Sequence, residues 1–161
     1  MWNRIKPYIL PYSVSIAIPL AVGALAAFIT KDNMNIYQDI SLPPLAPPGW
    51  LFPIVWTLLY ILMGISCAMI YSKRGQEPKN VKRALTYYAM SLISNFAWSI
   101  VFFNFGVFGF AFLWLLLLLY LIIRTILSYH KIYPLAAFLQ IPYAIWVAFA
   151  GYLNLMIYIL N

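Results

Sequence analysis

Residues 109–129 read GFAFLWLLLLLYLIIRTILSY, and this stretch decides the fold class. It matches the roughly 20 apolar residues that a helix needs to cross a bilayer, and Arg124 is its only charged residue. Apolar and polar residues do not alternate along it, as they would in a half-buried strand. An open sheet also could not satisfy its edge hydrogen bonds in lipid. The stretch therefore predicts a membrane-spanning helix.

Four other stretches have the same character, namely residues 8–29, 50–71, 84–105 and 134–160. The composition agrees, because 65% of the residues are hydrophobic, only 8% are charged and the mean hydropathy is +0.88. A soluble domain is expected to have about 25% charged residues. The sequence therefore predicts an all-α integral membrane protein, in which residues 1–161 form one domain, a bundle of five transmembrane helices.

The first stretch, residues 8–29, also has features of a signal peptide. Arg4 and Lys6 precede it, and residues 24–26 read ALA, which resembles a cleavage site. We favour a retained helix, because the apolar run is longer than the 7 to 15 residues of a usual signal-peptide core.

Basic residues gather on one side of the predicted bundle. Nine of the ten fall in the N-terminal tail, in the second connection, and in the fourth connection together with the end of the span before it: Arg4, Lys6, Lys73, Arg74, Lys79, Lys82, Arg83, Arg124 and Lys131. The other side has only Lys31, close to Asp32 and Asp39. The positive-inside rule then predicts a multi-pass protein of the cell membrane with a cytoplasmic N-terminus and an outside C-terminus. Because the excess positive charge is a topology signal, nucleic acid is not an expected partner.

The longest connection, residues 30–49, is predicted to lie on the outer face. It contains Pro43, Pro44, Pro47 and Pro48, whose fixed φ angles favour a stiff, polyproline-like path. Such a segment can act as a lid over the bundle. The alternative is a plain connector, although a connector could be much shorter than about twenty residues.

The chain has few groups for acid–base or metal chemistry. All of its acids lie in predicted connections, and its only histidine, His130, ends the fourth span. Cys67 stands alone in an apolar run and is expected to be a small core residue. No cluster has the spacing of metal ligands, so no metal site is predicted. These observations disfavour hydrolases, transferases and proton-coupled transporters.

The predicted spans instead carry aromatic and mildly polar side chains at helical spacing. Three stripes result, formed by Trp56, Tyr60 and Met63, by Ser91, Asn95, Trp98 and Phe102, and by Tyr143, Trp146 and Ala150 with Asn154 on the adjoining face. Trp98 lies at mid-span, where its N–H needs a partner. Its place beside Asn95 predicts either a helix–helix hydrogen bond or a polar feature of a ligand pocket.

Two further tryptophans lie near predicted membrane interfaces. Trp2 is expected to anchor the chain at the interface, as tryptophans commonly do there. Trp50 also lies at an interface, but it directly follows the proline-rich segment. Both anchoring and ligand contact therefore stay open for Trp50.

Several blocks of the sequence are similar to one known family. PPLAPPGWLFP at residues 43–53 and VWTLLYILMG at residues 55–64 resemble the signature of the TspO/MBR family. This family comprises the tryptophan-rich sensory proteins and their relative, the mitochondrial translocator protein or peripheral benzodiazepine receptor. NFAWS at residues 95–99 resembles the third helix of the family, and PYAIWVAFA at residues 142–150 resembles the fifth.

The resemblance implies a five-helix bundle that forms a homodimer and has no covalently bound cofactor. It implies a pocket under the first long loop for porphyrins such as protoporphyrin IX and haem, for sterols and for benzodiazepine-type drugs. It also implies a role in tetrapyrrole transport, stress sensing or light-dependent porphyrin degradation. Matched position by position, the ligand-binding residues are Tyr37, Pro47, Trp50, Asn95, Trp98, Trp146 and Ala150.

The chain departs from the family pattern at a few positions. Ile36 stands where many relatives have Trp, Leu42 where many have Lys, and Trp114 where several have an acid. No basic residue follows Tyr158, so the sterol-recognition pattern of animal relatives is absent. Sterol is therefore disfavoured as the native ligand.

Residues and resemblance together favour a tetrapyrrole, which is a flat π-system that can stack on indole rings. The first hypothesis is a membrane receptor or transporter that binds porphyrins and related apolar ligands. The second is an enzyme-like degradation of bound porphyrin by light and oxygen, with oxidisable Trp50 and Trp146 as catalytic candidates. The third is a structural bundle in which the aromatic side chains only pack.

Overall fold

The computed structural model describes the backbone of residues 2–161 and the side chains from residue 7 onward. The predicted roles of the Trp2, Arg4 and Lys6 side chains therefore lie outside the described residues. The described chain contains five long helices, α1 (Trp2–Thr30), α3 (Leu51–Tyr71), α4 (Pro78–Phe103), α5 (Phe108–Ile132) and α6 (Pro134–Leu160). Two short elements follow α1, a 3₁₀ turn (Lys31–Asn33) and α2 (Ile36–Asp39). The described residues form no strand, and the predicted all-α fold is confirmed.

All five long helices are long and apolar enough to cross a membrane, which confirms the five predicted spans. Their bounds differ most from the prediction at the starts of α1 and α4, which begin at Trp2 and Pro78 rather than at residues 8 and 84. Hydropathy detects only the lipid-immersed part of a helix. Proline suits the first helical position, because its φ angle is already helical and its missing N–H would have had no partner there. The polar segment after Pro78 is therefore helical as well.

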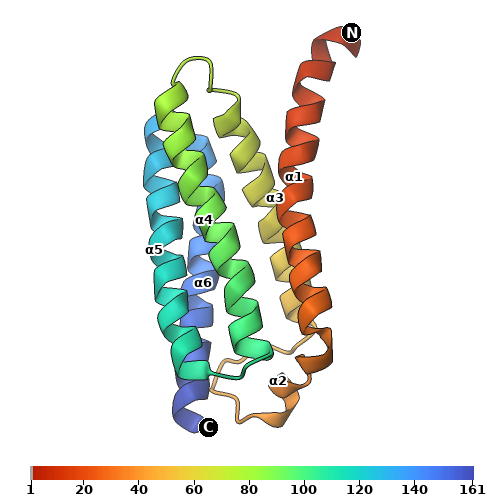
Figure 1. Ribbon diagram of the computed structural model, residues 1–161, viewed down its shortest axis with the longest axis vertical. Helices are drawn as coiled ribbons and strands as arrows, with labels where there is room; N and C mark the ends of the chain where they lie inside the picture. The colour runs from red at the N-terminus through yellow and green to blue at the C-terminus, as the bar shows by residue number, and fades with distance from the viewer. Residues whose placement is uncertain (1) are drawn as a thin grey trace.

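The five helices form a closed bundle (Figure 1). Helix α1 packs against α3 and α4, α3 packs against α6, and α5 lies between α4 and α6. The N-terminus and the α3–α4 connection lie at one end, and the C-terminus and the loop of residues 31–50 lie at the other (Figure 1). We call these the basic end and the loop end. Which end faces the cytoplasm stays a prediction.

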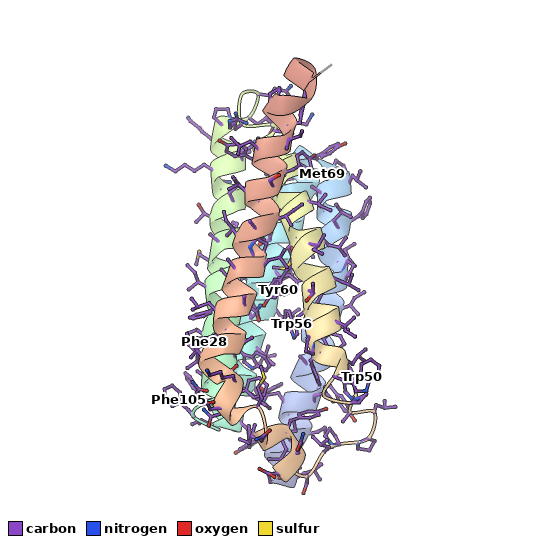
Figure 2. The ribbon with its side chains drawn as sticks, turned by 90° about the vertical axis from the view of Figure 1, so that its right-hand side faces the viewer. Phe28, Trp50, Trp56, Tyr60, Met69 and Phe105 are labelled. Carbon is purple, nitrogen blue, oxygen red and sulfur yellow. The ribbon has the colours of Figure 1, made fainter. Side chains whose placement is uncertain are left out.

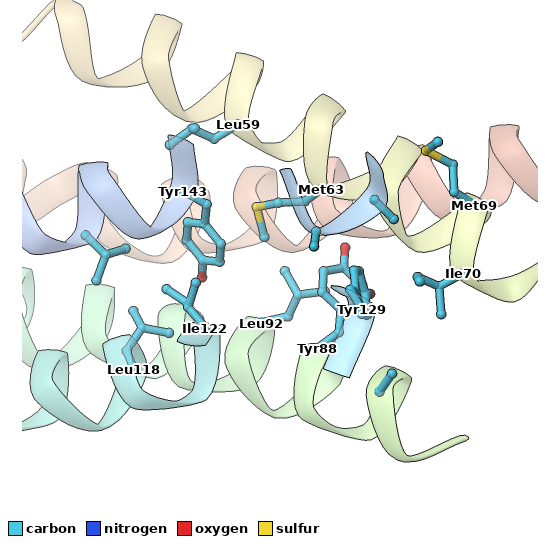
Figure 3. Close-up of a cluster of buried hydrophobic side chains, with 14 of the residues drawn as sticks. Leu59, Met63, Met69, Ile70, Tyr88, Leu92, Leu118, Ile122, Tyr129 and Tyr143 are labelled. Atoms are coloured by element: carbon cyan, nitrogen blue, oxygen red, sulfur yellow. The ribbon is translucent and has the colours of Figure 1, made fainter. Parts of the chain in front are cut away.

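The core of the bundle lies between α3, α4, α5 and α6 (Figure 3). Met63, Tyr129 and Tyr143 are fully buried there. Helix α1 is the outer helix, because only 17% of its most apolar stretch is buried, compared with 33–44% for the corresponding stretches of the other four. Helices α3 to α6 therefore hold the interior, and α1 covers one side of it.

The loop of residues 31–50 is folded rather than extended. After α2, the Ala46 N–H donates to the Pro43 carbonyl (3.2 Å), and Leu45 has a φ of 69°. These residues form a turn, where the sequence predicted a polyproline-like path. The reason is that a proline φ near −65° fits the second position of a β-turn, here Pro44, as well as it fits an extended chain.

Polar side chains fasten this loop to the bundle. The Asn161 amide N–H donates to the Ser41 carbonyl (3.1 Å), and the Ser41 N–H donates to Asn161 Oδ1 (2.9 Å). The Tyr152 hydroxyl donates to the Pro44 carbonyl (2.9 Å). We call these three hydrogen bonds the loop clasp. They connect the proline-rich part of the loop to α6 and to the residue that follows it.

Asn161→Ala is expected to loosen the loop and leave the bundle intact. The change removes two of the three clasp bonds, both of them exposed, so the loss of global stability is only about 1 kcal/mol. Local opening is expected to raise hydrogen–deuterium exchange at Ser41 several-fold. Mass spectrometry of peptides covering the loop measures it. Asn80→Ala, at the basic end, is the matched control, and equal exchange in both variants would show that the clasp does not hold the loop.

Candidate functional site

Aromatic rings from the loop, α3 and α6 meet inside the loop end of the bundle. The centroids of the Tyr37 and Phe52 rings are 5.3 Å apart, and those of Phe52 and Trp146 are 5.8 Å apart. Both pairs are edge-to-face, the geometry that the ring quadrupoles favour. We call the following set the aromatic cluster: Tyr37, Phe52, Trp56, Tyr60, Tyr143 and Trp146.

The second half of the aromatic cluster lies deeper in the bundle. Trp56 stacks on Tyr60 with 5.6 Å between centroids, and it meets Tyr143 of α6 edge-to-face at 6.2 Å. Trp56 and Tyr60 are four residues apart and therefore share one face of α3. Figure 2 shows both side chains directed from α3 toward the interior. The cluster thus runs from the loop into the bundle core.

Amide side chains join the aromatic cluster to α4, and they join α4, α5 and α6 to one another. Asn95 is buried, and its amide N–H donates to the Tyr60 hydroxyl (3.2 Å). The Trp98 indole N–H donates to Asn154 Oδ1 (3.1 Å), and the Asn154 amide donates to the Phe108 carbonyl (2.7 Å). Of the two predicted alternatives for Trp98, the structure shows the helix–helix hydrogen bond. Its partner is Asn154 of α6 and not the neighbouring Asn95.

The loop closes over this region through Tyr37. Its hydroxyl donates to the Pro47 carbonyl (2.8 Å). Burial raises the pKa of the Tyr37 phenol above its ordinary value of 10.0, so the hydroxyl keeps the proton that it donates. Tyr37 and Pro47 are both in the predicted ligand-binding set, and the structure places them in contact.

Two polar atoms of the cluster are buried and have no hydrogen-bond partner among the described residues, namely the Trp146 indole N–H and the Tyr143 hydroxyl. An unpaired buried donor costs about 1–3 kcal/mol, so such groups are rare in native interiors. The Trp146 ring also contacts Phe149, with 5.7 Å between centroids. These two groups could donate to a polar atom of a ligand.

One predicted site residue lies apart from the others. Trp50 is 67% exposed and points away from the bundle at the loop end (Figure 2). Trp98, Trp146 and Ala150, by contrast, belong to one contiguous apolar core. Trp50 therefore does not face Trp146, and its position suits an anchor at the membrane interface.

The model of the TspO/MBR family matches residues 15–160. The chain belongs to the TspO/MBR family. It is a multi-pass membrane protein, since its five long helices are long and apolar enough to cross a membrane.

Several relatives in the family are similar over most of their length. The tryptophan-rich protein TspO of Chlorobaculum tepidum is 35% identical over 159 residues, which cover 95% of this chain and 97% of that protein. The translocator protein of Bos taurus is 36% identical over 138 residues, covering 85% of this chain and 82% of that protein. The protein CrtK of Rhodobacter capsulatus is 34% identical over 125 residues, covering 78% of each.

One departure from the TspO/MBR pattern has a clear structural role. The Trp114 indole N–H donates to the Ser94 carbonyl (2.8 Å) and so ties α5 to α4. The side chain is half-buried and stacks obliquely on Phe110, with 5.9 Å between centroids. At this position the present chain therefore uses a hydrogen bond from an indole to the backbone of the neighbouring helix.

Sequence reasoning missed Phe52, which links the loop to Trp146. The signal was present, because Phe52, Trp56 and Tyr60 follow one another at intervals of four residues on α3. It was overlooked because Phe52 lies in the proline-rich signature, close to the predicted interface. Tyr143 and Asn154 were placed on the correct face of α6, but no role in the site was predicted for them.

The site offers aromatic surface and neutral donors rather than charge. Among the described residues, no group of three or more His, Cys, Asp or Glu side chains could hold a metal ion. His130 is exposed and lies at the opposite end of α5. Two surface hollows, of about 510 and 620 Å³, lie outside the aromatic cluster. The arrangement therefore suits contact with a flat, largely apolar molecule, not acid–base chemistry.

Proposed function

We propose that the protein is a receptor or transporter of the cell membrane that binds porphyrins, such as protoporphyrin IX and haem. Related apolar ligands, such as benzodiazepine-type drugs, would use the same site. The observation that supports this most is Trp146, whose ring faces Phe52 while its buried N–H has no partner among the described residues. An aromatic face next to a free donor matches a flat π-system with carboxylate edges.

The expected affinity follows from the chemistry of the ligand. Burial of apolar surface contributes about 25 cal/mol per Å², so a largely buried macrocycle gains several kcal/mol before ordering costs. The Trp146 N–H and the Tyr143 hydroxyl could each donate to a ligand acceptor, which would offset the cost of leaving these groups unpaired. Micromolar binding is therefore expected.

Entry of a macrocycle would require movement of the loop. Tyr37 contacts Phe52 from the loop side, and the loop clasp holds the proline-rich part of the loop against α6. Release of the clasp would uncover Phe52 and Trp146 without changing the helices. In this proposal the loop is the lid that the sequence predicted, and the clasp sets how often it opens.

Trp146→Phe is expected to weaken porphyrin binding about tenfold. The variant keeps an aromatic ring but loses the indole N–H that would donate to a ligand carboxylate. A hydrogen bond to a charged group is worth about 1.5–3 kcal/mol. The measurement is a titration of purified protein with protoporphyrin IX and with haem, followed by porphyrin absorbance, with a sterol added as a competitor. Trp50→Phe, the same substitution at the exposed tryptophan, is the matched control and should bind like the wild type. Equal affinity in the two variants would contradict the assignment of Trp146, and absence of saturable binding in the wild type would contradict the function itself.

A further inference from the structure

An open groove of about 510 Å³ runs along α4 at the basic end, near the end of α3. Arg74 and Lys82 lie at its mouth, and Leu85, Ala89 and Ile93 continue along it. At 1.5 Å per residue, the distance from Lys82 to Ile93 is about 16 Å, close to the hydrocarbon depth of one leaflet, about 15 Å. The groove therefore has the length of a lipid chain that enters from the headgroup region.

Helical periodicity explains why the groove beyond Lys82 is lined by apolar side chains. Lys82, Leu85, Ala89 and Ile93 recur every three or four residues and so form one stripe of α4. Ala89 provides a small side chain in the middle of the stripe, and Ile93 is 68% exposed. In a membrane protein such exposed side chains contact lipid, so an acyl chain is the natural occupant of this part of the groove.

The mouth of the groove is positively charged and held in place. The Arg74 guanidinium donates to the Tyr71 carbonyl (3.1 Å) and lies over the Tyr71 ring, 4.0 Å from its centroid. Residues 72–83 contain five basic residues and one acid, Glu77, which gives a net charge of +4. Glu77 accepts a hydrogen bond from the Asn80 amide (2.9 Å). The charge at the mouth is therefore complementary to an anionic headgroup.

We propose that this groove is a binding site for an anionic phospholipid. The phosphate lies between Arg74 and Lys82, and one acyl chain follows Leu85, Ala89 and Ile93. Basic pockets between membrane helices bind anionic headgroups, and Arg in particular offers several donors to a phosphate. The site is at the opposite end of the bundle from the aromatic cluster, so it does not depend on the proposed porphyrin function.

The test compares two double variants that remove the same charge from the same segment. Arg74→Gln with Lys82→Gln changes the mouth of the groove, whereas Lys79→Gln with Arg83→Gln changes two basic residues that do not line it. Native mass spectrometry measures retention of phosphatidylglycerol and of phosphatidylcholine with identical acyl chains. At about fivefold per basic residue, the wild type is expected to prefer phosphatidylglycerol about 25-fold. The first double variant should lose the preference, and the second should keep it.

Equal loss in both double variants would overturn the proposal, because it would show diffuse electrostatic attraction without a site. A second arm tests the acyl chain. Ala89→Trp fills the groove and should reduce retention of both lipids, whereas Leu113→Trp on α5 should not. Glycerol phosphate, which has the headgroup chemistry but no chains, should not displace the lipid. Unchanged retention in Ala89→Trp, or displacement by glycerol phosphate, would show that no chain occupies the groove.

Discussion

Gly64→Val is expected to lower the free energy of unfolding by about 3 kcal/mol, the cost of severe overpacking in a buried site. Gly64 lies on α3 and is buried against α1. A Cβ atom at this position would overlap the Ile16 Cα atom and lie 2.7 Å from the Ser15 carbonyl oxygen. Both are backbone atoms of α1, so no side-chain rotation can relieve the contact. Helix α1 would have to move away from α3.

Thermal unfolding in detergent measures the effect, and Gly151→Ala provides the control. Gly151 lies on α6, and nothing is within 4 Å of a Cβ atom added there. Alanine favours a helix over glycine by about 1 kcal/mol, so this variant should be as stable as the wild type or more stable. A loss of stability is therefore expected in Gly64→Val and not in Gly151→Ala. Wild-type stability in Gly64→Val would show that the close approach of α1 and α3 does not contribute.

Asn154→Leu is expected to cost about 2 kcal/mol. Asn154 is buried, accepts the Trp98 indole N–H and donates to the Phe108 carbonyl. Leucine keeps the γ-branched shape and leaves no cavity, so loss of packing is not the main cause. The loss arises because the Trp98 N–H is left without its acceptor and the link between α4, α5 and α6 is broken.

A double-mutant cycle with Trp98→Phe isolates this interaction. Once Asn154 is leucine, Trp98→Phe removes an N–H that already has no partner, so the two costs should not add. The control cycle uses Trp114→Phe, because the Trp114 N–H donates to the Ser94 carbonyl and shares no partner with Asn154. That cycle should be additive. Additive costs in the Trp98 cycle would show that the hydrogen bond between Trp98 and Asn154 does not contribute to stability.

The sequence predicted the five spans well because lipid acts on each segment separately. A run of about 20 apolar residues is stable in a bilayer only as a helix, whatever its neighbours are. The rule fails outside the lipid. It missed the start of α4 at Pro78, and it predicted an extended path for the loop, where α2 and the turn at Leu45 are formed.

The candidate site was predicted less completely than the spans. Helical spacing placed Trp56 and Tyr60 on one face of α3, and the structure shows both in the aromatic cluster. Spacing gives the side chains that share a face, but it does not give the rotation of that face toward a particular neighbour. For this reason the partner of Trp98 was not foreseen, and Trp50 was grouped with side chains that it does not meet.

The amino-acid sequence alone determined that this chain is a five-helix membrane protein and which end of the bundle is basic. Both properties are sums over local segments, since hydropathy and charge act residue by residue against the surrounding solvent. The tertiary structure alone decided that Trp146 faces Phe52, that Asn154 holds Trp98 and that Asn161 holds the loop. These contacts join residues far apart in the chain, so they depend on how the helices are ordered and rotated when they pack.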